Sequence, residues 1–378
     1  MMLRTSRRSA LKFAVGGLSA AATARPRALL AREPDKVRVG AIRWDAWYAP
    51  DMAPNSSEWY AAHGLDPQRY HHRAPFFAEE SDKDRMFISG TQASMDAEIS
   101  YAANAGIGYW AFGWYQFGRP LRKGWEYYQL SERNTLINWC ALIGLGSLAG
   151  NFPPRSDLVS YFQYPNYEKF GDRPLLYVMH DKSSLPAAAR ALEALRAACA
   201  SAGVGNPYIV LQSSVAKLAA ADARSIGADA ISAYASAPPI SGGPLPYASL
   251  DGFVRKFWLE MAATGLPIVP NGLTGWDRRP RIERPPPFDP IAAKPDDYVV
   301  PGTPAEIAGH VGAAVAFVKS HPATCPAGTA LVYSWNECDE GGSVLCPTWS
   351  RSGADHTLLD AVAKVLKPAD VRSLQPHR

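Results

Sequence analysis

The chain has 378 residues, 47% of them apolar and 20% charged, which is the composition of an ordinary folded protein large enough to build a core. Its net charge of +4 comes from residues 1–31, which hold six Arg and Lys and no acid, so the remainder has a net charge of −2 (+4 less 6). This balance argues against nucleic acid as a partner, and five cysteines are too few for a disulfide scaffold.

Residues 1–31 have the layout of a twin-arginine export signal. Arg7 and Arg8 stand before an Ala/Gly-rich stretch over 14–24, and further basic residues follow it. The apolar stretch is about a dozen residues long, shorter than the roughly 20 of a transmembrane helix. We therefore expect a periplasmic or secreted protein that meets the Tat translocase during export. Cleavage after Ala31 would release it, and an uncleaved signal would be its one membrane contact; a disordered basic tail is the alternative interpretation.

Residues 32–378 are expected to form one domain, because no repeat or second domain is visible and 347 residues (378 less 31) fit one large α/β barrel. Apolar strand-like runs alternate with helical runs, which predicts a parallel sheet with crossover helices. Eight such runs are present, and eight parallel strands close a (β/α)8 TIM barrel. The predicted strands are Val37–Arg43, Ile107–Phe112, Ile137–Ile143, Leu175–Met179, Tyr208–Gln212, Ala230–Tyr234, Pro267–Pro270 and Ala330–Ser334.

Helices are predicted between the strands at 91–105, 184–202, 249–264 and 303–320. In the last of these, Thr303 is expected as N-cap and Glu306 as its capping-box partner. A doubly wound open sheet is the main alternative, but no Gly-rich phosphate loop follows the first strand. Two long connections, 49–90 and 272–302, each follow a strand and should therefore lie on the catalytic face of a barrel.

Polar and aromatic side chains follow most of the predicted strands. Taken singly, each has an ordinary explanation, since a tryptophan is more often core packing and a histidine such as His180 more often structural. Together they are typical of a carbohydrate-binding cleft, where rings stack on sugars and polar groups bind hydroxyls. The candidate substrate-binding residues are Trp44, Asp45, Trp114, Tyr115, His180, Tyr234, Trp276, Asp277, Arg281, Trp335 and Asn336.

The run from Leu331 to Gly342 carries the strongest functional signal, because an apolar strand stops in a group of carboxylates. Glu337 and Glu340 are three residues apart, so a turn after the strand can bring both into one cleft. Two carboxyls that share a cleft repel each other, which yields an acid and a base near neutral pH. The alternative is a solvated acidic loop. Cys338 and Cys346 flank this loop and are either paired or free thiols. No Cys or His spacing indicates a metal site, and no cofactor is predicted.

Two runs, G-W-D-R-R-P-R at 275–281 and W-N-E-C-D-E-G at 335–341, resemble the WbsX-like branch related to glycoside hydrolase family 99. The resemblance extends from Val37 to about Leu366. It implies a (β/α)8 barrel and a retaining endo-acting α-mannosidase or mannanase without a metal. It further implies that Glu337 is the base toward the sugar 2-hydroxyl, which gives an anhydro-sugar intermediate, and that Glu340 is the general acid and then the base.

The same comparison shows a departure at residues 338–339, where the family has an aromatic and a polar residue and this chain has Cys338 and Asp339. A different sugar is therefore expected. Two other functions stay open. One is a glycosyltransferase of polysaccharide assembly, which export disfavours because nucleotide-sugar donors are cytoplasmic. The other is a non-catalytic glycan-binding protein with Trp44, Trp114 and Trp276 as platforms.

Overall fold

The computed structural model describes residues 37–48, 53–82, 85–181, 184–286 and 294–367. They belong to one compact unit that begins at Val37. The expected export signal over 1–31 lies outside the described residues. Within the described residues, no helix is both long and apolar enough to cross a membrane.

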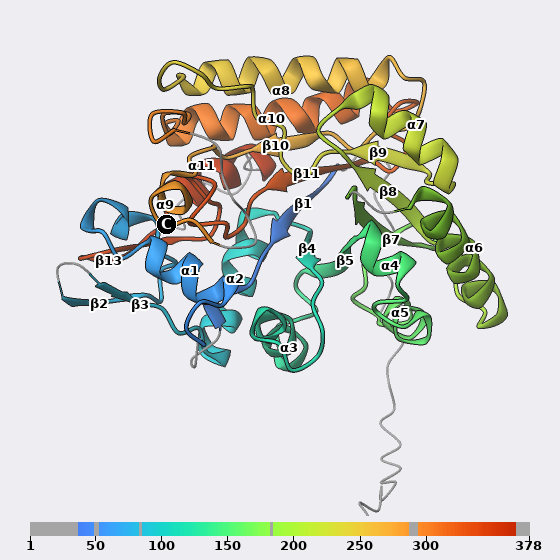
Figure 1. Ribbon diagram of the computed structural model, residues 1–378, viewed down its shortest axis with the longest axis horizontal. Helices are drawn as coiled ribbons and strands as arrows, with labels where there is room; N and C mark the ends of the chain where they lie inside the picture. The colour runs from blue at the N-terminus through green and yellow to red at the C-terminus, as the bar shows by residue number, and fades with distance from the viewer. Residues whose placement is uncertain (1–36, 49–52, 83–84, 182–183, 287–293, 368–378) are drawn as a thin grey trace, which may run out of the picture. The chain divides into compact units, whose positions relative to one another are not determined.

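The described residues contain eight parallel strands arranged side by side, as the sequence predicts (Figure 1). Their order around the sheet is β10-β11-β1-β4-β5-β7-β8-β9, so each strand lies beside its neighbour in the chain. This is the topology of a (β/α)8 barrel. The strands are β1 (Arg38–Arg43), β4 (Tyr109–Gly113), β5 (Asn138–Gly144), β7 (Arg173–Met179), β8 (Tyr208–Gln212), β9 (Ala230–Ser232), β10 (Asn271–Leu273) and β11 (Thr329–Tyr333).

The seventh strand differs from its prediction of Pro267–Pro270, because the regular strand β10 begins only at Asn271. Proline has no N–H to donate to a strand ladder, which explains the shift. The stretch before β10 still closes the barrel through an isolated parallel bridge between Ile231 and Ile268. The Ile231 N–H donates to the Pro267 carbonyl at 3.0 Å and the Val269 N–H donates to the Ile231 carbonyl at 3.0 Å.

The barrel interior is filled by side chains rather than open. Tyr109 reaches across it, and its hydroxyl lies 2.8 Å from that of Tyr177 and 3.0 Å from Thr329 Oγ1. A Cβ atom at Gly40 would lie 2.2 Å from the Tyr109 ring, so glycine is required there. All residues of β8 and β11 are buried, which explains why these strands read as continuous apolar runs.

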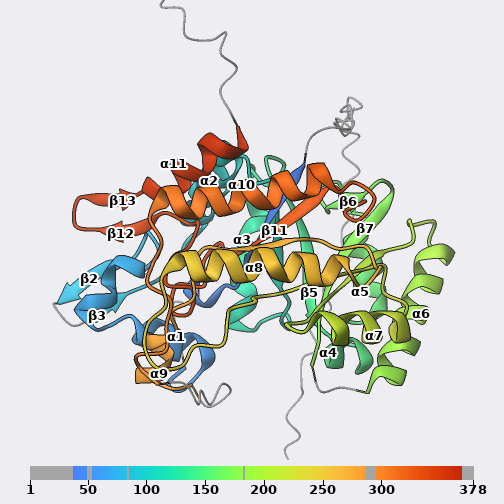
Figure 2. The ribbon, with the colours of Figure 1, turned by 90° about the horizontal axis from the view of Figure 1, so that it is seen from above.

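Helices cover the outside of the barrel, and α8 and α10 lie side by side over β10 and β11 (Figures 1 and 2). Thr303 caps α10, and the predicted capping box with Glu306 is confirmed. Thr91 likewise caps α2, at the predicted start of that helix. The helices are α2 (Gln92–Ala105), α3 (Lys123–Leu130), α4 (Leu145–Ala149), α5 (Arg155–Phe162), α6 (Leu185–Ser201), α7 (Ala216–Ile226), α8 (Tyr247–Ala262), α10 (Pro304–Ser320) and α11 (Thr357–Leu366).

The two long connections carry short elements of their own. The first holds η1 (Ala46–Tyr48), α1 (Ser57–Gly64), η2 (Gln68–Arg73) and the hairpin of β2 (Glu79–Asp82) and β3 (Arg85–Phe87). The second holds α9 (Arg279–Glu283), which contacts α1. A further hairpin of β12 (Thr348–Ser350) and β13 (Gly353–Asp355) follows β11, and β6 (Lys169–Phe170) pairs with β7.

Candidate active site

The loop after β11 folds back on itself and so brings its carboxylates together. The Glu340 and Gly341 N–H groups donate to the Glu337 carbonyl at 3.2 and 2.8 Å, and the Glu337 N–H donates to Ser334 Oγ at 3.0 Å. The loop also lies very close to the chain after β10. A Cβ atom at Gly275 would lie 2.4 Å from the Gly341 carbonyl oxygen, which a side chain would not allow.

Glu337 is 3% exposed and is contacted by the loop after β9 and by α9. The Tyr234 hydroxyl, just after β9, donates to Oε1, and Arg281 Nη2 lies 3.4 Å from Oε2. The pKa of Glu337 is raised to about 8, mainly by burial and then by the charge of Glu340, while Arg281 and the Tyr234 hydrogen bond lower it and Asp339 raises it slightly. The carboxyl of Glu337 therefore releases its proton at a higher pH than an ordinary glutamate.

Glu340 is 7% exposed and faces a different set of donors. The Tyr333 hydroxyl, from β11 itself, donates to Oε1 at 2.9 Å, and Arg281 Nη1 donates to Oε2. Arg278 Nε lies 3.5 Å from the same Oε2. Because Glu337 and Glu340 touch one guanidinium, their carboxyl groups lie well within about 10 Å, the range in which paired carboxylates act on one glycosidic bond.

Aromatic side chains from several strand ends surround the pair. The Tyr234 and Tyr333 rings have centroids 5.4 Å apart, and Trp276 lies 5.9 Å from Tyr333. On the side of β1 and β4, Trp44 Nε1 donates to the Tyr115 hydroxyl at 2.8 Å, and the Arg281 guanidinium lies 5.4 Å from the Trp44 ring. The structure thus brings Tyr234, Trp276, Trp44 and Tyr115, all of them predicted site residues, to the surroundings of the glutamates.

Asn336 and Asp45 lie beneath the pair and fix its loop to β1. Asn336 Oδ1 accepts from the Trp44 N–H at 2.9 Å, and its Nδ2 donates to Asp45 Oδ1 at 3.1 Å. Arg43 Nε donates to the same Asp45 oxygen at 2.8 Å. Burial is the main cause that raises the pKa of Asp45 to about 6, against the pull of Arg43. Both side chains are 2% exposed or less, so they orient the loop in this structure.

Four predicted site residues have other partners. Trp335 is fully buried, and its Nε1 donates to Glu98 at 3.0 Å. Trp114 stacks on Trp139 with centroids 5.6 Å apart and carries the Arg122 guanidinium on its ring at 3.6 Å. The remaining two also have partners outside the glutamate pair. His180 Nε2 lies 2.9 Å from Asp222 Oδ2 on α7, and the buried Asp277 forms ion pairs with Arg73 and Arg279.

Several residues of the site escape sequence reasoning. Tyr333, Ser334, Arg278 and Asp339 all contact the glutamates or their partners, and each lies inside or beside one of the two motif runs, so adjacency to a motif was their available signal. Glu98 is different, because it lies mid-helix in α2. An acid on the apolar face formed by Met95, Ile99 and Ala102 could have indicated that Glu98 is buried.

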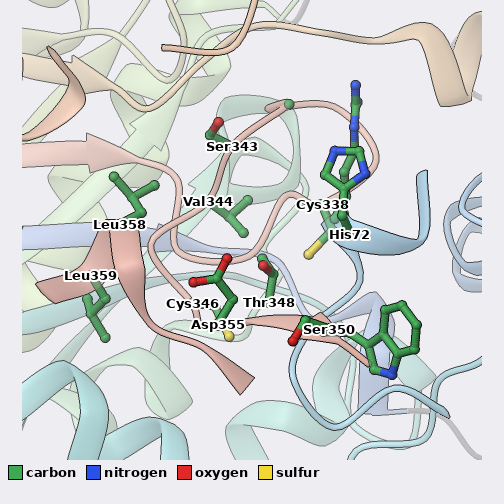
Figure 3. A pocket seen from close by; sticks show the side chains of 13 residues that line it. His72, Cys338, Ser343, Val344, Cys346, Thr348, Ser350, Asp355, Leu358 and Leu359 are labelled. Atoms are coloured by element: carbon green, nitrogen blue, oxygen red, sulfur yellow. The ribbon is translucent and has the colours of Figure 1, made fainter. Parts of the chain in front are cut away.

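A cavity of about 200 Å³ lies against the same loop, and neither glutamate lines it (Figure 3). Leu358 and Leu359 of α11 form one side and His72 and Cys338 the other. Cys346 also lines this cavity, and both thiols are free. No cluster of three or more His, Cys, Asp or Glu side chains suited to a metal is present among the described residues.

Comparisons with protein-family profiles and with curated proteins find no match for this sequence. Solved structures do match. The endo-α-mannosidase of glycoside hydrolase family 99 (GH99) from Bacteroides thetaiotaomicron, in complex with bis-tris propane, has a TM-score of 0.53 at 12% identity, over 88% of this chain and 96% of that one. A second structure of that enzyme gives a TM-score of 0.52 at 14% identity, over 88% and 97% of the two chains. The chain therefore has a GH99-like (β/α)8 barrel fold.

Proposed function

We propose that the chain is an exported retaining glycoside hydrolase that acts on a polysaccharide or glycan, with an α-mannoside as the first linkage to test. The observation that supports it most directly is the placement of Glu337 and Glu340, both buried at the end of β11 and both in contact with Arg281. The solved structures of the same fold belong to an endo-α-mannosidase, which supports the choice of linkage.

In the proposed first step, the ionised Glu337 takes the proton of the sugar 2-hydroxyl. The 2-oxygen then bonds to the anomeric carbon while the glycosidic bond breaks, and Glu340 gives its proton to the departing oxygen. A carboxylate with a raised pKa is a stronger base than an ordinary one once it is ionised, which suits removal of a hydroxyl proton. The product of this step is a 1,2-anhydro sugar and a released glycan fragment.

In the second step, the now ionised Glu340 takes a proton from water, whose oxygen bonds to the anomeric carbon as the anhydro ring opens. The 2-oxygen recovers its proton from Glu337, so both carboxyls return to their starting states. Two inversions at one carbon give net retention. Tyr234 and Tyr333 donate hydrogen bonds to the two carboxyls and so hold their orientation through both steps.

The glycan-binding alternative receives less support from the geometry. Trp44 and Trp114 are each 7% exposed, and Trp114 is occupied on its ring by Trp139 and Arg122. A stacking platform needs an open face. Among the three proposed platforms, only Trp276 is partly exposed. A glycosyltransferase would require an activated sugar donor, so its turnover would depend on adding that donor.

The decisive experiment measures reducing-sugar release and product size from α-mannans, bacterial exopolysaccharides and capsular glycans. Wild type is run beside Glu340→Gln, with and without nucleotide-sugar donors. Release by wild type that disappears in the variant is expected. Binding without release would contradict hydrolysis and favour the glycan-binding function, and turnover only with a donor would favour the transferase.

We propose export on separate grounds, the paired arginines at 7 and 8 before the apolar stretch. Replacing both with lysine should leave the protein in the cytoplasm, because the twin-arginine pair is what the translocase recognises. Fractionation of cells that express wild type or the Arg7→Lys, Arg8→Lys variant measures this directly. A variant exported as well as wild type would contradict the proposal.

A further inference from the structure

Arg281 is a single buried cation shared by three acids of one loop. It lies on α9 and is 9% exposed. Its Nη1 donates to Glu340, and its Nη2 lies 3.4 Å from Glu337. Its Nε donates to Asp339 at 2.8 Å, and Nη2 also reaches Asp339 at 3.4 Å. The guanidinium thus contacts all three acids of residues 337–340.

Asp339 anchors the Arg281 guanidinium. It is 2% exposed and takes the guanidinium through both of its oxygens, the geometry that fixes an arginine most firmly. With Nε bound there, the two terminal nitrogens of Arg281 point to the two glutamates. Asp339 itself occupies one of the two positions between the glutamates where the sequence departs from the family pattern.

We propose that Asp339 and Arg281 are a pair of positioning residues: Asp339 fixes the guanidinium, and the guanidinium fixes the orientation and the charge balance of Glu337 and Glu340. The roles of the two glutamates in this statement rest on the proposed hydrolase function. The coupling of charges within the group does not, because it is a property of the unliganded protein.

The charge balance follows from every group that faces Glu337. On its own loop these are Glu340 and Asp339, which favour its neutral form, and on α9 it is Arg281, which favours its ionised form. The Cys338 thiol on the same loop also feels the charge of Glu337, and three tyrosines complete the surroundings. They are Tyr234 after β9, which donates a hydrogen bond to Glu337, and Tyr115 and Tyr333, whose own pKa values burial raises and the charge of Glu337 raises further.

This arrangement predicts opposite effects for the two members of the pair. Asp339→Asn removes a negative charge beside Glu337, so Glu337 should titrate lower than in wild type. Arg281→Gln removes the positive charge, so Glu337 should titrate higher. Each shift should be about one pH unit, at the low end of the effect of a charge within hydrogen-bond reach. A purely structural pair would not move the titration in two directions.

The test is a carbon NMR titration of the unliganded protein labelled at its glutamate carboxyls, with the Glu337 signal assigned by its loss in Glu337→Gln. Asp229→Asn is the matched control. Asp229 also binds two arginines, Arg173 and Arg196, but lies at the start of β9, at the opposite end of the barrel. The control should leave the Glu337 titration unchanged.

Shifts of opposite sign support the proposal, whereas equal shifts, or no shift in either variant, overturn it. If Arg281→Gln fails to fold, Arg281→Lys keeps a charge but loses the fork, so Glu337 should still titrate higher than in wild type, opposite to Asp339→Asn; a shift to lower pH, or none, overturns the proposal. The assay for glycan release remains independent. The proposed function fails if no glycan is cleaved while the titration shifts as expected, and the positioning pair fails if cleavage occurs without those shifts.

Discussion

The chain buries two groups of carboxylates beside the end of β11, and they differ in how hydrogen-bond donors meet the acid. In the first, which we call the Glu98 network, four donors converge on one carboxylate. Arg43 Nη2 lies 2.5 Å from it, Trp335 Nε1 3.0 Å and Cys346 Sγ 3.2 Å, and the Tyr48 hydroxyl donates as well. In the second, Glu337 has Tyr234 and a 3.4 Å contact with Arg281, and faces two other acids.

This difference separates a carboxylate that holds the fold from one that is suited to chemistry. Both Glu98 oxygens are filled by side chains from separate parts of the chain, so the acid joins α2 to the ends of β1 and β11. The donors to Glu337 do not offset its burial and the neighbouring charges, so its ionised form is costly. The same Glu→Gln substitution should therefore reduce activity in the group of Glu337 and Glu340 and reduce stability in the Glu98 network.

The largest expected effect is the loss of activity in Glu340→Gln. The amide keeps the shape of the side chain but cannot exchange a proton, so turnover should fall roughly 10²- to 10⁴-fold. The thermal unfolding midpoint should change little. The control is Glu283→Gln on α9, since among the contacts described Glu283 binds only Arg69 and Tyr70, away from the glutamate pair. Wild-type turnover in Glu340→Gln would contradict the assignment of this residue as acid and base.

In the Glu98 network the large effect should fall on stability instead. Glu98→Gln removes the charge that balances the fully buried Arg43, and it turns an amide N–H₂ toward donors. Breaking a buried charge pair from one side costs about 3–5 kcal/mol, so the free energy of unfolding should fall by that order. Denaturant unfolding measures it. An unchanged midpoint would show that Asp45 alone balances Arg43.

The contrast also shows which parts of the molecule can be predicted from sequence. The eight strands and the position of the glutamate pair depend on local patterns, namely apolar runs that end in turn-forming residues. These signals persist in the fold, as β11 and its loop illustrate. The start of the seventh strand at Asn271 could have been anticipated, because the prolines at 267 and 270 have no N–H to donate to a neighbouring strand.

What local patterns could not predict is the direction in which a side chain points after its strand ends. Trp335 and Asn336 adjoin Glu337 in sequence, yet both point into the protein, toward Glu98 and Asp45 respectively. Arg281 comes from a distant connection and points to the glutamates. Such directions depend on tertiary packing, and the Glu98 network joins residues up to 248 positions apart.

A smaller effect is expected in the stability of Glu337→Gln, and its size depends on pH. The folded pKa of Glu337 is raised from its usual 4.5 to about 8. Between these values the folded state binds more protons than the unfolded state, so this group makes stability fall as pH rises. Glutamine does not ionise, so the variant should gain on wild type by about 0.5–2 kcal/mol toward pH 8. Unfolding midpoints of both proteins at pH 5 and pH 8 test this; a difference that does not grow with pH contradicts it.

The smallest effect should come from Cys346→Ala, which removes one donor of four from Glu98. The loss should be about 0.5–1.5 kcal/mol, the net worth of one hydrogen bond, because the other three donors remain. Cys346 lines the cavity of about 200 Å³, so removing its sulfur atom enlarges an existing space and does not open a new one in packed surroundings. Glycan turnover should be unchanged, since the network orients β1 and β11 through its other members.

This substitution also tests whether Cys346 pairs with Cys338. Burial raises the pKa of both thiols well above the usual value, which slows the thiolate chemistry that a disulfide requires. A disulfide would contribute about 2–4 kcal/mol and its loss would depend on reductant. Unfolding of wild type and Cys346→Ala with and without dithiothreitol separates the two cases. An equal, small loss in both conditions places Cys346 in the Glu98 network as a donor, whereas a large loss that reductant abolishes would make it a covalent tie on the loop after β11.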